Sequence, residues 1–163
     1  MNHLDLNPIS LLKKSGCPEN VIEHCIAVRD LAMVFARNAP ADPHIVETGA
    51  LLHDIGRCRS HTLAHGQIGA DMCRDYGLPE EICLIIERHI GAGLSADECR
   101  KEGLKPIDCI PETIEEKIVA HADNLISGTK EITLDERLRR SVDLSEDTKR
   151  RIKDLADEIE IYR

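Results

Sequence analysis

Apolar residues recur every three or four positions along most of this 163-residue chain, which is the period of an amphipathic helix. Glycines follow several of these runs, at Gly77, Gly91 and Gly128, where they are typical of helix ends. The pattern predicts seven or eight short helices. The segments expected to be helical are residues 18–38, 42–54, 63–76, 78–91, 95–102, 113–126 and 145–163.

The composition favours an all-α fold in one domain. The chain has three aromatic residues and is rich in Ala, Leu, Ile, Glu and Arg, a mixture that favours helices over sheets. Its length is sufficient to bury a continuous core without disulfides or a structural metal. No repeat, low-complexity linker or composition shift marks a second domain. We therefore expect a compact single-domain helical bundle over residues 1–163.

Charge and cysteine content limit the environment and the partners. The formal net charge of −9 argues against broad contact with nucleic-acid backbones, and no apolar run approaches membrane-spanning length. The seven cysteines are odd in number, lack paired C-x-x-C spacing and come without a signal peptide. This usage fits a reducing compartment, so the sequence predicts a cytoplasmic protein whose cysteines are small core or surface residues.

A polar doublet, His53 and Asp54, closes an otherwise apolar helical run over residues 50–55. A histidine and a carboxylate in a buried segment are costly unless another group compensates them, and a divalent metal ion commonly does so. Gly56 can terminate the helix here, and the negative end of the helix dipole favours a nearby cation. The two side chains would diverge by about 100° on a helix, so one ion must lie between them or they must bind differently.

Three more histidines and one aspartate lie on the apolar stripes of other predicted helices. His24, for example, aligns with Val28, Leu31 and Phe35 at helical spacing, so its ring faces the core. Each such residue alone is most simply a hydrogen-bonded core side chain. Together with the doublet they would leave several uncompensated polar groups in one small core, which a shared metal site resolves. The additional candidate ligands are His24, His65, His89 and Asp123.

The order of these residues resembles the HD superfamily of metal-dependent phosphohydrolases. The resemblance covers about residues 20–128 and centres on Leu51-Leu52-His53-Asp54-Ile55-Gly56, with residues 116–125 completing the series. It implies an all-α HD-domain fold of about seven or eight helices. It also implies four ligands for a first metal, namely His24, His53, Asp54 and Asp123.

Two further motifs resemble those of HD enzymes with two metals. Residues 64–70 match the H-G-x-x-G-A element that begins at His65, and residues 87–91 match the next histidine, His89. The resemblance implies that Asp54 bridges two ions while His65 and His89 hold the second. The closest pattern is that of symmetrical dinucleoside tetraphosphate hydrolases. Cyclic-dinucleotide phosphodiesterases and guanosine tetraphosphate hydrolases fit less well, since their G-Y-P and Glu-Asp elements are missing at the corresponding positions.

The resemblance implies a hydrolase that cleaves phosphate ester or anhydride bonds of a small phosphorylated metabolite, such as a nucleotide or dinucleotide. His53 and Asp54 would be catalytic through a metal-bound hydroxide. Six nitrogen and oxygen ligands without thiolate favour two iron or manganese ions, with Co, Ni, Zn or Mg as alternatives. The expected partner is the small nucleotide-like substrate, with neither nucleic acid nor membrane involved.

Positive or proton-donating groups near these motifs are candidates for substrate binding. Arg57 and Arg59 follow the doublet, and Arg88 precedes His89, so each is a possible phosphate ligand or an ordinary surface arginine. His61 can donate a proton to a leaving oxygen or lie exposed in a loop. The remaining histidines are excluded from the site because of their position or surface character: His3, His44 and His121.

Two other functions remain open from the sequence. In a one-metal nucleotidase, His65 and His89 would be core residues only. In a non-catalytic HD module, the same ligands would bind a nucleotide or metal for sensing or docking. The charged C-terminal helix over residues 145–163 can cover the core or dock a partner, and the first role is the simpler one.

Overall fold

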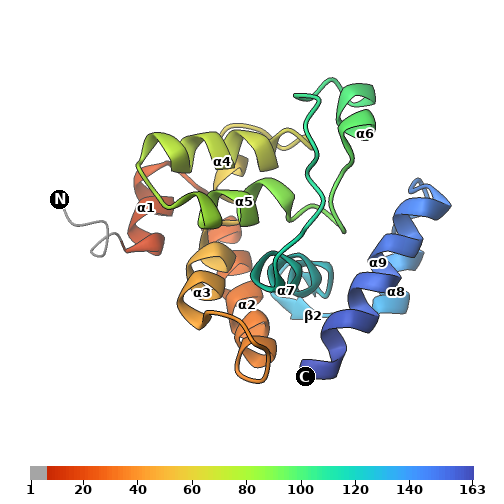
Figure 1. Ribbon diagram of the computed structural model, residues 1–163. Helices are drawn as coiled ribbons and strands as arrows, with labels where there is room; N and C mark the ends of the chain where they lie inside the picture. The colour runs from red at the N-terminus through yellow and green to blue at the C-terminus, as the bar shows by residue number, and fades with distance from the viewer. Residues whose placement is uncertain (1–6) are drawn as a thin grey trace.

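The computed structural model describes residues 7–163, which form a nearly all-helical bundle (Figure 1). The all-α class expected from the sequence is confirmed. The α-helices are α1 (Pro8–Lys14), α2 (Glu19–Ala36), α3 (Pro43–Leu52), α4 (His65–Asp75), α5 (Glu80–Arg88), α6 (Ala96–Lys101), α7 (Ile114–Asn124), α8 (Leu134–Arg139) and α9 (Glu146–Ile159). Two 3-10 helices, η2 (Ile55–Cys58) and η3 (Glu160–Tyr162), complete the helical elements of residues 7–163.

The structure adds short elements that the periodicity did not predict. Helices α1 and α8 have seven and six residues, too few for a repeating apolar pattern to become visible. A small antiparallel hairpin pairs β1 (Ile126–Ser127) with β2 (Lys130–Glu131), where helix 113–126 was expected to end. Gly128 permits this turn because its φ of 62° lies in the left-handed region.

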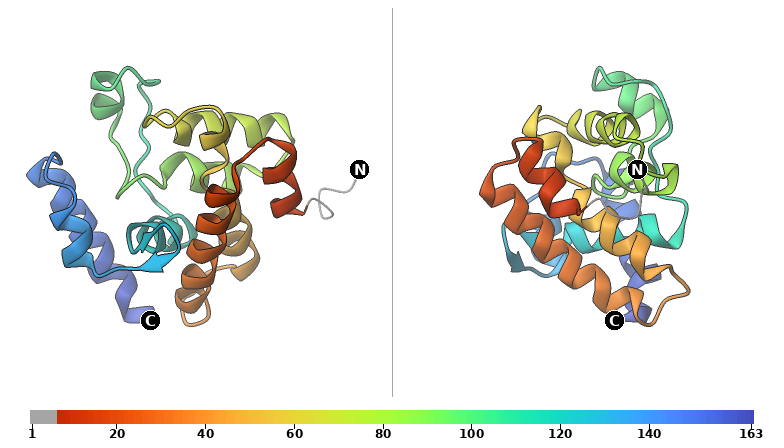
Figure 2. Two further views of the ribbon diagram at one scale, coloured as in Figure 1. Left: turned by 180° about the vertical axis from the view of Figure 1, so that it is seen from behind. Right: turned by 90° about the vertical axis from the view of Figure 1, so that its left-hand side faces the viewer.

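Two apolar clusters form the core. The larger lies around Phe35, where α2, α3, α7 and α9 meet, and the smaller lies around Ile55, among α1, α2, α4 and α5. Helix α2 packs against α3 and α7, and α4 packs along α5. Views from behind and from the side show α8 and α9 at the edge of the molecule opposite α1 (Figure 2). The elements that carry the candidate ligands therefore surround the boundary between the clusters.

The doublet lies just beyond a helix end rather than within the helix. Helix α3 starts at the cap residue Asp42 and ends at Leu52, and Asp54 has a φ of −99° and a ψ of 14°. The expected divergence of about 100° between the side chains therefore does not apply, since that value holds for two adjacent helical residues. Gly56 does not end the helix either, because it lies inside η2, four residues past the last residue of α3.

The charged C-terminal helix covers the core. Helix α9 buries Ile152, Leu155, Ala156 and Ile159, and it packs against α7. Its polar residues face solvent, as expected for an amphipathic helix on a protein surface. Over residues 7–163, no helix combines the length and apolarity needed to cross a bilayer.

Candidate metal centre

The structure brings together the six side chains that the sequence indicated as ligands. They come from five places in the chain: α2, the turn after α3, the first residue of α4, the residue after α5, and α7. His53, His65 and His89 are buried, as is Asp54, while His24 and Asp123 are partly exposed. Residues from position 24 to position 123 thus converge on one polar cluster.

One part of the cluster gathers around Asp123. The Nε2 atoms of His24 and His53 lie 2.9 Å and 3.4 Å from its Oδ1 atom. The Oδ2 atom of Asp54 lies 3.8 Å and 3.6 Å from the same two nitrogens. Ligand atoms held about 2.0–2.2 Å from one ion are about 3–4 Å from one another, so this spacing suits a first-row metal.

A second part gathers around the other oxygen of Asp54. The Nε2 atoms of His65 and His89 lie 3.1 Å and 3.4 Å from Asp54 Oδ1. His53, Asp54 and His89 also offer ligand atoms that all lie within 4.8 Å of one another, as do His24, His53 and Asp123. The two oxygens of Asp54 therefore face two different sets of histidines.

Backbone carbonyls fix the orientation of all four histidine rings. The Nδ1 atoms of His24, His53, His65 and His89 each lie 2.7 Å from a carbonyl oxygen. A carbonyl can only accept, so each Nδ1 carries the proton and, in the neutral ring, each Nε2 presents a lone pair to the cluster. Outer hydrogen bonds of this kind are typical of metal-ligating histidines. The carbonyls belong to Gly128, Ala50, Thr62 and Ile86.

Two observations indicate that these residues fit a cation. The Nε2 atoms of His65 and His89 lie 3.2 Å apart, where two lone pairs would repel each other. In addition, His53 Nε2 and Asp54 Oδ1 are buried without a hydrogen-bond partner in the described residues. Buried polar atoms without partners are rare and costly. A divalent ion near each group of ligand atoms would satisfy them.

The charges within the site support one another. Burial by itself disfavours the charged form of Asp54, yet the neighbouring His53 charge holds the pKa of this carboxyl well below its usual range. Burial also disfavours the charged form of Asp123, but the His53 charge outweighs burial and lowers the pKa of this carboxyl. Burial opposes protonation of His53, but the Asp54 charge raises its pKa well above the ordinary value. The folded site therefore keeps both carboxylates ionised and favours positive charge between them.

A close backbone contact places His65 beside the doublet. A Cβ atom on Gly56 would lie 1.9 Å from the carbonyl oxygen of His65 and 2.8 Å from the backbone nitrogen of Gly69. Only glycine fits at this distance, so η2 can lie directly on the start of α4. The glycine of the motif over residues 51–56 is therefore explained by space, and the contact brings His65 within reach of Asp54.

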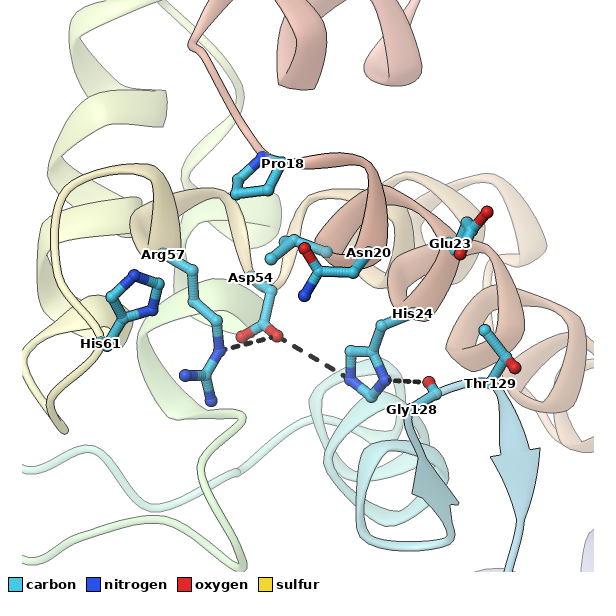
Figure 3. Close-up of a pocket in the computed structure, with 10 residues that line it drawn as sticks. Pro18, Asn20, Glu23, His24, Asp54, Arg57, His61, Gly128 and Thr129 are labelled. Carbon is cyan, nitrogen blue, oxygen red and sulfur yellow. Dashed lines mark hydrogen bonds and ion pairs between the residues drawn. The ribbon is translucent and has the colours of Figure 1, made fainter.

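A pocket of about 470 Å³ opens onto the cluster at His24 and Asp54 (Figure 3). Its size lies in the range of roughly 300–1,000 Å³ that is usual for small-molecule sites. Arg57 and His61, two of the four candidate substrate-binding residues, line it. The Nε atom of Arg57 donates to Asp54 Oδ2 over 3.0 Å, and this leaves the outer guanidinium nitrogens available. His61 lies in the loop before α4, which does not extend backwards to include it.

The other candidate residues lie elsewhere. Arg59 is exposed and Arg88 donates to the buried Glu116 carboxylate over 3.0 Å, and neither lines this pocket. The excluded His121 lies 2.9 Å from Glu160 on the far side of α7 from the cluster, and the excluded His44 is exposed. His3 falls outside the described residues.

Three polar residues of the pocket, Asn20, Glu23 and Thr129, were not among the candidates from the sequence. Asn20 and Glu23 precede His24 by four positions and one position, so helical spacing from a candidate ligand would have suggested Asn20. Thr129 lies in the turn of the hairpin, which the sequence pattern did not predict.

The fold and site together define an all-α protein with a histidine–aspartate centre suited to divalent metal. The family model described as HD domain matches residues 21–128, which is more than half of the chain. This chain belongs to the HD domain family. HD domains bind divalent metals, and the residues matched include every candidate ligand described above.

Two relatives show how this region occurs in other proteins. The chain is 47% identical over 137 residues to the uncharacterized protein MJ0778 of Methanocaldococcus jannaschii, covering 81% of this chain and 80% of the relative. It is 45% identical over 126 residues to the tRNA (cytidine(56)-2'-O)-methyltransferase of Thermoplasma volcanium, covering 77% of this chain. The match spans only 37% of that methyltransferase, so the similarity concerns one part of a longer protein.

A solved structure supports the fold. The HD domain of the L. monocytogenes phosphodiesterase PgpH in complex with cyclic-di-AMP aligns with a TM-score of 0.60 and 20% identity, covering 94% of this chain and 97% of that one. This likeness concerns the fold alone. The sequence also predicted a similarity to symmetrical dinucleoside tetraphosphate hydrolases. None of these three proteins is described as such a hydrolase, so they do not show this similarity.

Proposed function

We propose that this chain is a metal-dependent phosphohydrolase that cleaves an ester or anhydride bond of a small phosphorylated metabolite of the nucleotide type. Two divalent ions, with iron or manganese favoured, would be held by the six residues of the cluster. His24, His53, Asp54 and Asp123 would bind one ion, and Asp54, His65 and His89 the other. The membership of the HD family supports the general activity.

The observation that carries this proposal is the position of the Asp54 carboxylate between two sets of histidines. Its Oδ1 atom faces His65 and His89, and its Oδ2 atom faces His24 and His53. A carboxylate in this position can bridge two ions. When bound, two such ions would polarise phosphoryl oxygens and lower the pKa of a water molecule for attack on phosphorus.

The other residues of the pocket would bind and orient the substrate. Arg57 is fixed through its Nε atom to Asp54 and can direct its outer nitrogens at a phosphate oxygen. His61, at the pocket wall, can donate a proton from a ring nitrogen to the leaving oxygen. Arg59 and Arg88, which lie outside this pocket, would act in phosphate binding only after rearrangement.

The size and charge of the molecule support a small substrate. The pocket of about 470 Å³ suits a mononucleotide-sized ligand better than a polymer. The formal net charge of −9 disfavours extended contact with a phosphate backbone. A cytoplasmic location would be consistent with the free cysteines, of which Cys58 is partly exposed and the other six are buried.

The test is an assay of the purified protein with Fe²⁺ or Mn²⁺ against a panel of nucleotides and dinucleotides. We expect Asp54→Ala to abolish turnover, because both ions lose a ligand. His44→Gln is the matched control, since this exposed histidine lies outside the site and should leave turnover unchanged. Retained turnover in Asp54→Ala would contradict the mechanism.

Two alternatives make different predictions in the same experiments. A one-metal nucleotidase would keep single metal occupancy in His65→Ala and His89→Ala. A non-catalytic module would bind nucleotides tightly without forming product during long incubation. Six polar ligands inside one core favour the enzyme over the module, because a scaffold gains nothing from burying them.

A second candidate substrate is a phosphate group of RNA. The similarity to part of a tRNA methyltransferase favours it, although that relative is much longer than this chain. A short oligoribonucleotide with a terminal phosphate belongs in the substrate panel for this reason. Faster turnover of the oligoribonucleotide than of any mononucleotide would favour this candidate.

A further inference from the structure

The two sides of the pocket differ in charge. Arg57 and His61 lie on one side of Asp54, and Asn20, Glu23 and Thr129 lie on the other side, with Asn20 between Asp54 and His24 and the other two past His24 (Figure 3). The second side carries neutral hydrogen-bonding groups and one carboxylate but no Lys or Arg. An anionic group would be attracted to the side of Arg57 and repelled from the side of Glu23.

Asn20 is the neutral residue best placed to contact a bound molecule. It lies in the first turn of α2, four positions before His24, so both side chains are on the same face of the helix. Its amide group points toward the space between Asp54 and His24 (Figure 3). An amide can both donate to and accept from a hydroxyl group, which suits a sugar.

Glu23 and Thr129 extend this polar side outward. Both are exposed, and no ion pair joins Glu23 to a basic side chain within the described residues. A carboxylate without a cationic partner accepts hydrogen bonds from hydroxyl groups and opposes a second phosphate. Thr129 adds a hydroxyl group from the hairpin turn, beside the Gly128 carbonyl that orients His24.

The pocket offers no Phe, Tyr or Trp ring for stacking against a nucleobase, and of its two histidines His24 is turned toward the candidate metal ligands. The three aromatic residues of the chain are Phe35, Tyr76 and Tyr162, and none of them lines the pocket. Pro18 and Val21 provide only a small apolar surface. The polar lining of the pocket therefore suits the phosphate and the group directly attached to it better than a nucleobase.

Resting on the function proposed above, we infer that the substrate is a phosphate ester of a sugar or nucleoside with a single phosphate group. The phosphate lies toward Arg57, and the hydroxyl groups of the sugar contact Asn20, with Glu23 excluding a second phosphate. Linear polyphosphates and dinucleoside polyphosphates are disfavoured, because their charge would extend onto the side that carries Glu23.

The experiment compares three ligands on the manganese-loaded protein. These are a nucleoside monophosphate, its 2',3'-dideoxy analogue, and a nucleoside 3',5'-bisphosphate. Binding is measured by calorimetry and turnover by phosphate release, so the inference is decided even if no ligand is hydrolysed. We expect the monophosphate to bind best and the loss of the two hydroxyls to weaken binding by about 3- to 10-fold, the value of one net hydrogen bond.

Variants of Asn20 and Glu23 test whether these two residues cause the ligand preference. Asn20→Ala should weaken binding of the monophosphate by about 3- to 10-fold but leave the dideoxy analogue unaffected. Glu23→Gln should narrow the preference for the monophosphate over the bisphosphate. Glu19→Gln is the matched control, because Glu19 is also exposed in the first turn of α2 but does not line the pocket.

The outcomes separate this inference from the proposed function. Equal binding of the three ligands, or tighter binding of the bisphosphate, would overturn the inference even if hydrolysis is observed. Ligand preferences as expected without any phosphate release would support the inference and contradict the proposed hydrolysis.

Discussion

The Nε2 atoms of His65 and His89 face each other at 3.2 Å, while the Nδ1 atom of each ring donates to a backbone carbonyl 2.7 Å away. His65 begins α4 and its ring is held by Thr62 in the preceding loop, while His89 follows α5 and its ring is held by Ile86 in the last turn of that helix. Neither ring can turn without losing its carbonyl. The repulsion between the two lone pairs is therefore built into the fold unless a cation lies between them.

Metal binding should stabilise the folded protein for this reason. At a metal concentration 100 times the Kd, the free energy of unfolding should rise by about 2.7 kcal/mol. Urea titrations of the chelator-treated protein, with and without added Mn²⁺, measure the difference. Identical unfolding curves under the two conditions would show that the site does not bind the ion in the folded state.

Gly56→Ala should disrupt the site through packing. The added methyl would lie 1.9 Å from the His65 carbonyl oxygen, so η2 must move away from α4. We expect a loss of at least about 3 kcal/mol, the upper end for overpacking, and a lower metal content. Gly16→Ala is the control, because its Cβ meets no atom within 4 Å and its φ of 83° costs only about 1–2 kcal/mol. Unchanged stability and metal content in Gly56→Ala would refute this explanation of the glycine.

The two arginines considered as phosphate ligands should behave differently. Arg88→Met should cost about 3–5 kcal/mol of stability with little change in KM, because it removes the partner of Glu116, which is only 2% exposed. Arg57→Met should raise KM with a smaller loss of stability, since its guanidinium faces the pocket. An Arg88→Met variant with normal stability and a raised KM would reverse these assignments.

The contact between α6 and α9 should give the stability a dependence on acid pH. Burial alone would raise the pKa of Glu98, but hydrogen bonds from the Ser95 backbone and from Arg151 lower it overall. A lowered pKa means that the ionised form stabilises the fold above the ordinary pKa of 4.5, and that this stabilisation is lost as the pH falls through the folded-state pKa.

Urea titrations of the wild type and Glu98→Gln at about pH 7 and about pH 3 test this dependence. At the higher pH the wild type should be more stable than Glu98→Gln. The difference in the free energy of unfolding between the two proteins should shrink at the lower pH. A difference that stays constant across this range would mean that the Glu98 charge contributes nothing.

The sequence predicted which histidines and aspartates come together better than it predicted their surroundings. His24, His65 and His89 could be identified because each lies at helical spacing from apolar residues that must face the core. The contact of Gly56 with His65, in contrast, depends on how η2 packs against α4. The spacing of apolar residues in the sequence does not predict this packing. Arg88 and Arg57 both lie near a candidate ligand in the sequence, so both were candidates for phosphate binding. The sequence does not reveal that Arg88 pairs with Glu116, because the two residues are 28 positions apart. Asn20 lies at helical spacing from His24, but it is exposed, and its polarity alone does not distinguish it from other surface residues at the start of a helix.

The number of ions bound per chain tests the central claim most directly. Elemental analysis of the manganese-loaded protein should give two ions in the wild type and in His44→Gln, and one ion in His65→Ala. Asp54→Ala should bind fewer than one, because this carboxylate faces both sets of histidines. A single ion in the wild type that is retained in His65→Ala, or two ions in Asp54→Ala, would contradict a centre bridged by Asp54.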